Sequence, residues 1–306
     1  MSELLPTPYY HLVFTLPAEF NSLIIGNRKA LFKLLFDAAS QTIMNYSRMK
    51  NYLGVDCGIT MVLHTWGQQL NLHPHVHCIV TGGGFDGHKW IKAKRKNDNF
   101  LSPEPSLSKM YKAIFLKRIQ KMELQTQGID LGKIVNEVDK KRWNVYTKAP
   151  FGGPSQVVEY LGRCTHKIAI TKHRIVSVSD THVNFRYKDY SDNDKTKNSS
   201  LLRGEFLRRF EMHILPKRFT SSVRPLGSGV KIRHYGFLSS TWKRKKLKLL
   251  QEKLKVKVFE KVEKKPFLPK CPCCKTGNLH RIAVFDQRGP PAWYLGGGQN
   301  TIPCKS

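Results

Sequence analysis

Histidines occupy every second position in the middle of NLHPHVHCIVTGGG, which spans residues 71–84. Side chains two positions apart in a β-strand point to the same side of the sheet, so His73, His75 and His77 are expected to share one face. The opposite face should carry Val76, Cys78 and Val80. Imidazole nitrogens aligned along one strand can bind a single divalent cation together. The spacing therefore predicts a metal site on the polar face of this strand.

A metal site on one strand needs a further polar ligand from a neighbouring strand. His64, in VLHTW, and Gln68, just after it, are the candidates, and His64 is preferred. The competing interpretation is a set of exposed or hydrogen-bonded strand histidines that bind no metal. For an isolated pair the two interpretations are equally supported, whereas three histidines within five positions of a very basic chain favour the metal.

The charge balance points to a polyanionic partner. The 306 residues include 52 Lys and Arg against 22 Asp and Glu, which gives a formal net charge of +30. Such an excess attracts phosphate groups, so nucleic acid is the expected partner. A ribosome-associated protein or a membrane-surface binder would show the same excess, although no apolar run is long enough to span a membrane.

The N-terminus and the cysteines indicate a cytoplasmic protein. MSELLPTPYYHLVFTLP lacks the basic start and the small-residue cleavage site of a secretory signal. Seven cysteines, three of them in CPCC, are typical of thiols that are reduced or bound to metal. Cys271 and Cys274 have the spacing of a zinc knuckle, and the further ligands available are Cys273, His280 and Cys304. None of these three has motif-like spacing, so structural zinc stays a hypothesis.

Local patterns predict the elements that position these residues. Strands are expected at 9–16, 59–66 and 71–84, and helices at 27–48 and from Ser106 or Ser108 onward, after a loop at 92–105. Further along, the expected elements are a hairpin at 173–187, a polar loop at 188–199 and a helix at 200–212. Short strands that alternate with helices predict an α+β fold. Its largely antiparallel central sheet should carry the histidine strand and be flanked by helices.

The C-terminal part is strongly basic. From Lys243 to Lys265 eleven Lys and Arg stand against three Glu. A thin apolar stripe runs through it at Leu247, Leu250, Leu254 and Val258. A solvated helix packed on this stripe and a helix that contacts DNA directly are equally supported.

The stretch LHTWGQQLNLHPHVHCIVTGGG closely resembles the rolling-circle insertion-sequence transposases of the HUH endonuclease superfamily, named for histidine, hydrophobe, histidine. LPTPYYHLVFTLP, VVEYLGRCTHKIAI, HILPKRF and KIRHYGFL are similar to that family's landmarks and follow its order. The resemblance covers roughly residues 5–240. It implies an HUH-like catalytic domain at 1–240, followed at 241–306 by a basic helix and a cysteine-containing tail.

The resemblance also implies roles for particular residues. His75 and His77 would hold a Mg²⁺ or Mn²⁺ ion, with His64 or Gln68 as the third ligand. Tyr160 would attack a phosphodiester of single-stranded DNA, at element ends and target, and form a covalent 5′-phosphotyrosine. Arg163, on the same helix face, would stabilise phosphate charge.

The sequence departs from the family pattern in three places. Cys164 stands where the family has its second tyrosine, so a relay between two tyrosines of one subunit is not expected. A single tyrosine would have to act more than once, or a freed 3′-hydroxyl or a second subunit would have to complete the transfer. TSSVRPLGSG, between LPKRF and VKIRHYGFL, makes that connection longer than in the family. The cysteine-rich zinc-binding segment that family members carry before the region starting here at MSELLPTPYY is absent, so part of the DNA-end recognition is expected to be missing.

Two rival functions remain at this point. One is a non-catalytic nucleic-acid-binding protein, either a decayed transposase copy or a basic RNA-associated protein. The other is a replication initiator or relaxase with the same chemistry. Formation of a covalent DNA adduct separates the enzymes from the binding protein, and the identity of the DNA separates the enzymes from each other.

Overall fold

The computed structural model describes residues 5–93, 103–148, 150–151, 153–166, 169–190, 192–215, 232–254 and 273–276. The chain divides into two compact units, residues 1–258 and 259–306. Everything below concerns the first unit, apart from the exposed turn at 273–276. Among the described residues no helix has the length and apolar character needed to cross a membrane.

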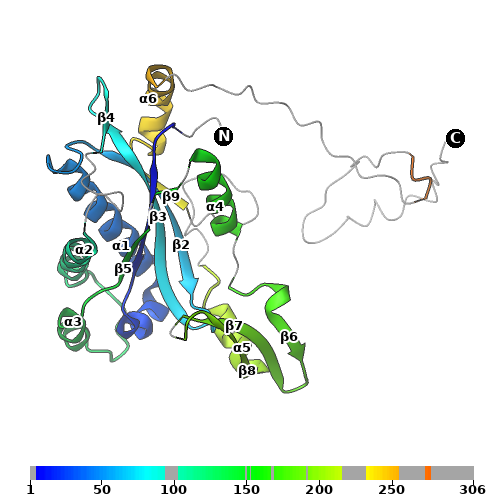
Figure 1. The fold of residues 1–306 in the computed structure, drawn as a ribbon. Helices are drawn as coiled ribbons and strands as arrows, with labels where there is room; N and C mark the ends of the chain where they lie inside the picture. The colour runs from blue at the N-terminus through cyan, green and yellow to red at the C-terminus, as the bar shows by residue number, and fades with distance from the viewer. Residues whose placement is uncertain are drawn as a thin grey trace, which may run out of the picture. The chain divides into compact units, whose positions relative to one another are not determined.

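The first unit is an α+β structure built around two antiparallel sheets (Figure 1). Its strands are β1 (Tyr9–Thr15), β2 (Cys57–Trp66), β3 (Leu72–Phe85), β4 (Trp90–Lys92), β5 (Val145–Lys148), β6 (Ile175–Val178), β7 (His182–Asp189), β8 (Lys195–Leu202) and β9 (Ile232–Gly236). Its helices are α1 (Asn21–Arg48), α2 (Glu104–Ile119), α3 (Leu131–Asp139), α4 (Pro154–His166), α5 (Arg203–Glu211) and α6 (Ser240–Lys253), with short 3₁₀ turns at Ala18–Phe20 and Lys172–Arg174. The expected fold class is confirmed.

The larger sheet has the order β5-β1-β3-β2-β9, and β4 pairs with the far end of β3. The sheet carries the histidine strand, as the sequence predicted, and this strand is its central one. One face packs on α1, α2 and α3, and α4 lies on the other (Figure 1). The opposite-face residues Val76, Cys78 and Val80 are fully buried in the helix-covered core, so the alternation inferred from the sequence is confirmed.

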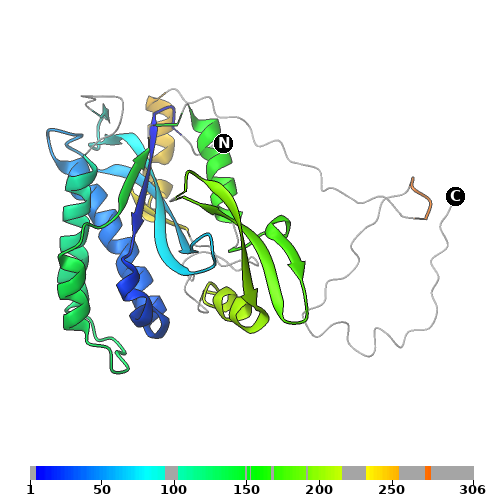
Figure 2. The ribbon, with the colours of Figure 1, turned by 60° about the horizontal axis from the view of Figure 1, so that its bottom comes forward.

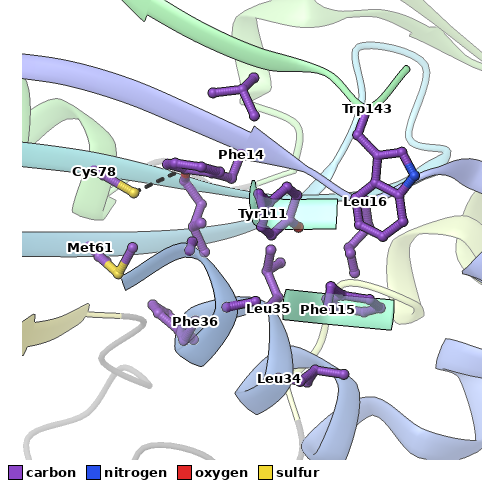
Figure 3. Close-up of a cluster of buried hydrophobic side chains, with 14 of the residues drawn as sticks. Phe14, Leu16, Leu34, Leu35, Phe36, Met61, Cys78, Tyr111, Phe115 and Trp143 are labelled. Carbon is purple, nitrogen blue, oxygen red and sulfur yellow. Dashed lines mark hydrogen bonds between the residues drawn. The ribbon is translucent and has the colours of Figure 1, made fainter. Parts of the chain in front are cut away.

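The main core is aromatic and lies between the sheet and these helices (Figure 3). Phe14 of β1 meets Tyr111 of α2 edge-on at a ring-centroid distance of 5.0 Å. Trp143 packs against Tyr111 and Phe115 at 5.2 and 5.3 Å. Each such side chain stabilises the fold by about 1.5–3 kcal/mol through burial alone. The sheet face that carries the histidines is thus held on a rigid support.

The second sheet has the order β6-β7-β8, and α5 lies beside it (Figure 2). Phe185 of β7 packs against Phe206 of α5. The predicted hairpin forms its first two strands. The predicted loop at 188–199 was wrong in its second half, and the predicted helix began too early, because β8 pairs with β7 along its whole length and α5 begins at Arg203. KTKNSSLL carries no apolar alternation because the residues on its less exposed face, Lys197, Ser199 and Leu201, are mostly polar and only half-buried.

Other element boundaries differ from the prediction by a few residues. Helix α2 begins at Glu104, ahead of both expected starts. Helix α1 begins at Asn21, and the expected start at Asn27 coincides with a kink, where that residue has non-helical dihedrals. The Asn27 side chain donates to the carbonyl oxygens of Leu23 and Gln125. Helix α6 buries Leu250 in a cluster with Phe85, so the predicted apolar stripe packs at this residue.

Candidate metal centre and active site

His75 and His77 of the histidine strand and His64, the preferred third ligand, lie together on the sheet. His64 of β2 stands opposite His75 of β3, and His77 lies two positions further along β3. One ring nitrogen from each lies within 4.8 Å of the others. Metal–imidazole bonds are about 2.1 Å long, so small side-chain rotations bring all three nitrogens to one cation. His64, His75 and His77 can therefore hold a metal ion.

The hydrogen bonds of two of these rings set the tautomers that metal binding requires. Nδ1 of His75 donates to the carbonyl oxygen of His73 at 2.7 Å, and Nε2 of His64 donates to the carbonyl oxygen of Cys164 at 3.0 Å. Because a carbonyl oxygen only accepts, these nitrogens carry the protons. Nε2 of His75 and Nδ1 of His64 are then the deprotonated ligand nitrogens, as in sites where a backbone acceptor orients a metal-binding histidine.

Helix α4 brings Tyr160 to the edge of this cluster. The helix packs through the buried Val157 against Tyr9 and Ile79, which lie on the histidine face of β1 and β3. The Tyr160 hydroxyl oxygen lies 2.9 Å from Nδ1 of His77. The structure thus brings together the phenol and the histidine cluster, from segments far apart in the sequence.

His11 completes this arrangement, although the sequence analysis gave it no role. Its Nε2 lies 2.8 Å from the Tyr160 hydroxyl oxygen and 3.0 Å from Nδ1 of His77. These distances are satisfied together when the Tyr160 hydroxyl donates to His11 and Nδ1–H of His77 donates to the hydroxyl oxygen. His77 then presents Nε2 as its ligand nitrogen.

The environment of His11 keeps its ring neutral. Burial, and to a smaller extent the positive charge of Lys148, lower the pKa of His11 to about 4. A neutral imidazole whose deprotonated nitrogen accepts a phenol proton is the arrangement of a general base. Alternation in the strand YYHLVFT places His11 on one of its two faces. The sequence does not show the register between β1 and β3, which pairs His11 with Ile79 and so puts His11 on the same face as His77.

Gln68, the alternative third ligand, points elsewhere. Its side-chain Nε2 donates to the Tyr190 hydroxyl at 2.8 Å, and its Oε1 accepts from the backbone N–H of Lys188 at 3.4 Å. Both partners belong to the second sheet and the turn that follows β7. The structure therefore groups His64, and not Gln68, with the histidine strand.

The remaining predicted site residues lie partly outside the described structure. Arg163 belongs to α4, but its side chain is outside the described part of the chain, and so is all of Cys271. Cys274 lies in an exposed turn beside Cys273. The zinc hypothesis for the tail therefore stays a prediction.

Comparison with known proteins places the chain in a family. The model of the family Y2_Tnp, described as "Putative transposase", matches residues 58–246, a range that includes the three histidines and Tyr160. The "Putative transposase y4qJ" of Sinorhizobium fredii (strain NBRC 101917 / NGR234) is 35% identical over 326 residues, with 95% of this chain and 77% of the relative covered. The transposase for insertion sequence element IS801 of Pseudomonas savastanoi pv. phaseolicola is 29% identical over 244 residues, and these cover 76% of this chain but only 55% of that relative.

Among solved structures, two of the conjugative relaxase TrwC are similar to this chain. The metal-bound complex with oriT DNA has a TM-score of 0.30 and 17% identity. The match covers 56% of this chain and 59% of the TrwC chain. The complex with a 27-mer DNA comprising the recognition hairpin and the cleavage site has a TM-score of 0.33 and 15% identity. That match covers 66% of this chain and 71% of the TrwC chain. The family match and the 35% identity carry the assignment: the chain belongs to the Y2_Tnp family of transposases.

Proposed function

We propose that this transposase cuts single-stranded DNA with Tyr160 and moves the strand through a covalent 5′-phosphotyrosine, in rolling-circle transposition of an insertion sequence. The observation that carries the proposal is the 2.9 Å contact between the Tyr160 hydroxyl and His77, a member of the metal-capable cluster. A nucleophile beside a cation site is the arrangement that phosphoryl transfer needs. The formal net charge of +30 supports a polyanionic substrate.

In the proposed reaction the Tyr160 hydroxyl gives its proton to Nε2 of His11 as its oxygen forms a bond to phosphorus. The bond between phosphorus and the 3′ oxygen breaks, and that oxygen takes a proton from water to become a 3′-hydroxyl. Nδ1–H of His77 donates to the tyrosine oxygen while it carries negative charge, which lowers the energy of the ionised phenol. The phosphodiester energy stays in the phosphotyrosine bond for rejoining.

The metal ligands in this proposal are His64, His75 and His77. A divalent cation bound there would polarise the scissile phosphate as a Lewis acid. Three neutral nitrogen ligands suit Mn²⁺ better than Mg²⁺, which prefers oxygen. The three rings fit such an ion because backbone carbonyls already orient two of them in the ligand tautomer.

One tyrosine per subunit has to suffice in this proposal. Cys164, at the second-tyrosine position, is 2% exposed, so its side chain is packed inside the protein. Strand transfer then depends on the freed 3′-hydroxyl, on a second use of Tyr160, or on a second subunit. Arg163, on the same helix, is the residue we assign to the phosphate charge.

The test is covalent trapping of DNA. Wild-type protein is incubated with Mn²⁺ and 5′-labelled and 3′-labelled single-stranded oligonucleotides that tile the ends of its element. A denaturing gel should show a protein–DNA adduct that keeps only the 3′-side label, and peptide mass spectrometry should place the nucleotide on Tyr160. The adduct should be absent from Tyr160→Phe, which keeps the ring but lacks the hydroxyl. Salt-sensitive binding by the wild type without any adduct would support the non-catalytic alternative instead.

A further inference from the structure

A cavity of about 350 Å³ opens at the β5 edge of the larger sheet. It is lined by Thr15, Glu104, Arg142, Trp143, Asn144, Val145 and Tyr146. Thr15 of β1 stands directly opposite His75 in the register of the sheet, so the cavity begins one strand away from a metal-ligand candidate. Its other walls come from the edge strand β5, the residues before it and the first turn of α2.

Tyr146 stands on the same sheet face as the histidines. It pairs with Val13 of β1, and Val13 pairs with His77 of β3. Residues directly opposite each other in a sheet share a face, and neighbouring strands lie about 4.8 Å apart, so Tyr146 is about 10 Å from His77 across the sheet. Its side chain is 55% exposed. An open aromatic face therefore lies close to the point where the scissile phosphate would bind.

The polar groups of the cavity differ in hydrogen-bonding character. Oε1 of Glu104 accepts from the backbone N–H and the hydroxyl of Thr147 at 2.8 and 2.9 Å, which fixes the carboxylate at the edge of β5. Arg142 adds a guanidinium donor, and Asn144 adds an amide that both donates and accepts. A nucleobase edge presents donors and acceptors side by side and matches such a set. A phosphate does not match, because the fixed Glu104 carboxylate would repel it.

We infer that this cavity receives one unstacked nucleobase of the single-stranded substrate, with Tyr146 stacked on its face and Glu104, Arg142 and Asn144 facing its edge. The volume lies at the lower end of the range for small-ligand sites, as expected for a single base. The inference rests on the proposed function for its substrate and adds a base-reading site to it. One position of the DNA, near the cleaved bond, is then recognised by shape and by hydrogen bonds.

The test is a scan of abasic positions, with binding as well as adduct formation measured. Short single-stranded oligonucleotides from the element end each carry one abasic position near the cleavage point. Wild-type protein should bind one of them about 5- to 100-fold more weakly than the intact strand, because base–aromatic stacking is lost. Tyr146→Ala should weaken binding of the intact strand by a similar factor and remove the penalty at that position. The matched control Tyr190→Ala, which removes an exposed tyrosine in the turn after β7, should keep the wild-type pattern.

A conservative variant tests the edge contacts separately. Glu104→Gln keeps an acceptor for Thr147 but loses the carboxylate charge, so it should alter which base is preferred at the same position and leave the other positions unchanged. The inference is overturned if the wild type shows no position-specific penalty, or if Tyr146→Ala weakens the intact and all abasic strands equally. Binding needs no cleavage, so a position-specific penalty without any adduct would refute the nicking proposal and leave the base site standing.

Discussion

Replacing His11 by glutamine should slow formation of the Tyr160–DNA adduct by about 10²- to 10³-fold at pH 7. A tyrosine phenol ordinarily ionises near pH 10, so only about one phenol in 10³ is ionised at pH 7, which corresponds to about 4 kcal/mol. His11 lies 2.8 Å from the hydroxyl and is neutral, because burial lowers its pKa to about 4. His11 takes the proton as the bond to phosphorus forms, so a free phenolate is not needed, and the variant without this acceptor loses that general-base assistance.

Glutamine is the informative substitution because its side-chain oxygen can still accept a hydrogen bond from Tyr160, while it cannot take up a proton. The assay is single-turnover adduct formation with Mn²⁺ and saturating oligonucleotide, measured from pH 6 to pH 10. The wild-type rate should depend little on pH above neutrality, whereas the His11→Gln rate should rise about tenfold per pH unit as free hydroxide replaces the missing base.

His234→Gln serves as the control for this experiment. His234 lies on the same face of the sheet, and its Nδ1 lies 3.0 Å from the Thr60 hydroxyl. This variant should keep the wild-type rate and pH profile. The reasoning is refuted if His11→Gln stays within about twofold of wild type at pH 7, or if its slower rate shows no dependence on pH.

The remaining predictions concern pH, metal, backbone and the second-tyrosine position. The folded pKa of His11 lies below its ordinary value of 6.5. Its function as a base should therefore persist as the pH falls from 7 to about 5 and be lost only near pH 4, and a bound cation would lower that limit further. The dependence of the wild-type rate on pH measures this. His64→Ala should raise the Mn²⁺ concentration needed for adduct formation by about 10- to 100-fold or more, seen in a metal titration after chelation. Gly236→Ala should cost about 1–3 kcal/mol in urea unfolding, because Gly236 has φ +63° and its added Cβ would collide with a neighbouring carbonyl, while Gly128→Ala, at φ +81° with open space, should cost less. Cys164→Ala should leave the adduct rate within about twofold of wild type, and Cys164→Tyr should destabilise the fold by about 1–3 kcal/mol without adding a second adduct site.

The parts of the fold and site that could be predicted from the sequence are those that depend on local periodicity. The alternation in NLHPHVHCIV assigned the faces of β3, and helical spacing located most of α1 and α2 within a few residues. The partnership of His11 with Tyr160 could not be predicted in this way. It depends on the register between β1 and β3 and on the packing of α4 against the sheet. The contacts that result join His11 to His77, 66 residues apart in the sequence, and His11 to Tyr160, 149 residues apart. The strand β8 was missed because two of the three residues on its less exposed face, Lys197 and Ser199, are polar, so no apolar period marks it.

Cys164, at the position that the family resemblance gives to a second tyrosine, is compatible with the proposed centre because the backbone at this position has its own role. Cys164 lies in the last turn of α4, where carbonyl oxygens have no partner within the helix. Its carbonyl accepts from Nε2 of His64, and the partial negative charge of a helix C-terminus strengthens a bond to that N–H. One turn earlier, Tyr160 reaches His77 and His11. The helix thus positions the proposed nucleophile and orients a metal-ligand candidate at the same time, so any displacement of α4 disturbs both, whereas a change of the side chain at 164 disturbs neither as long as it fits the space.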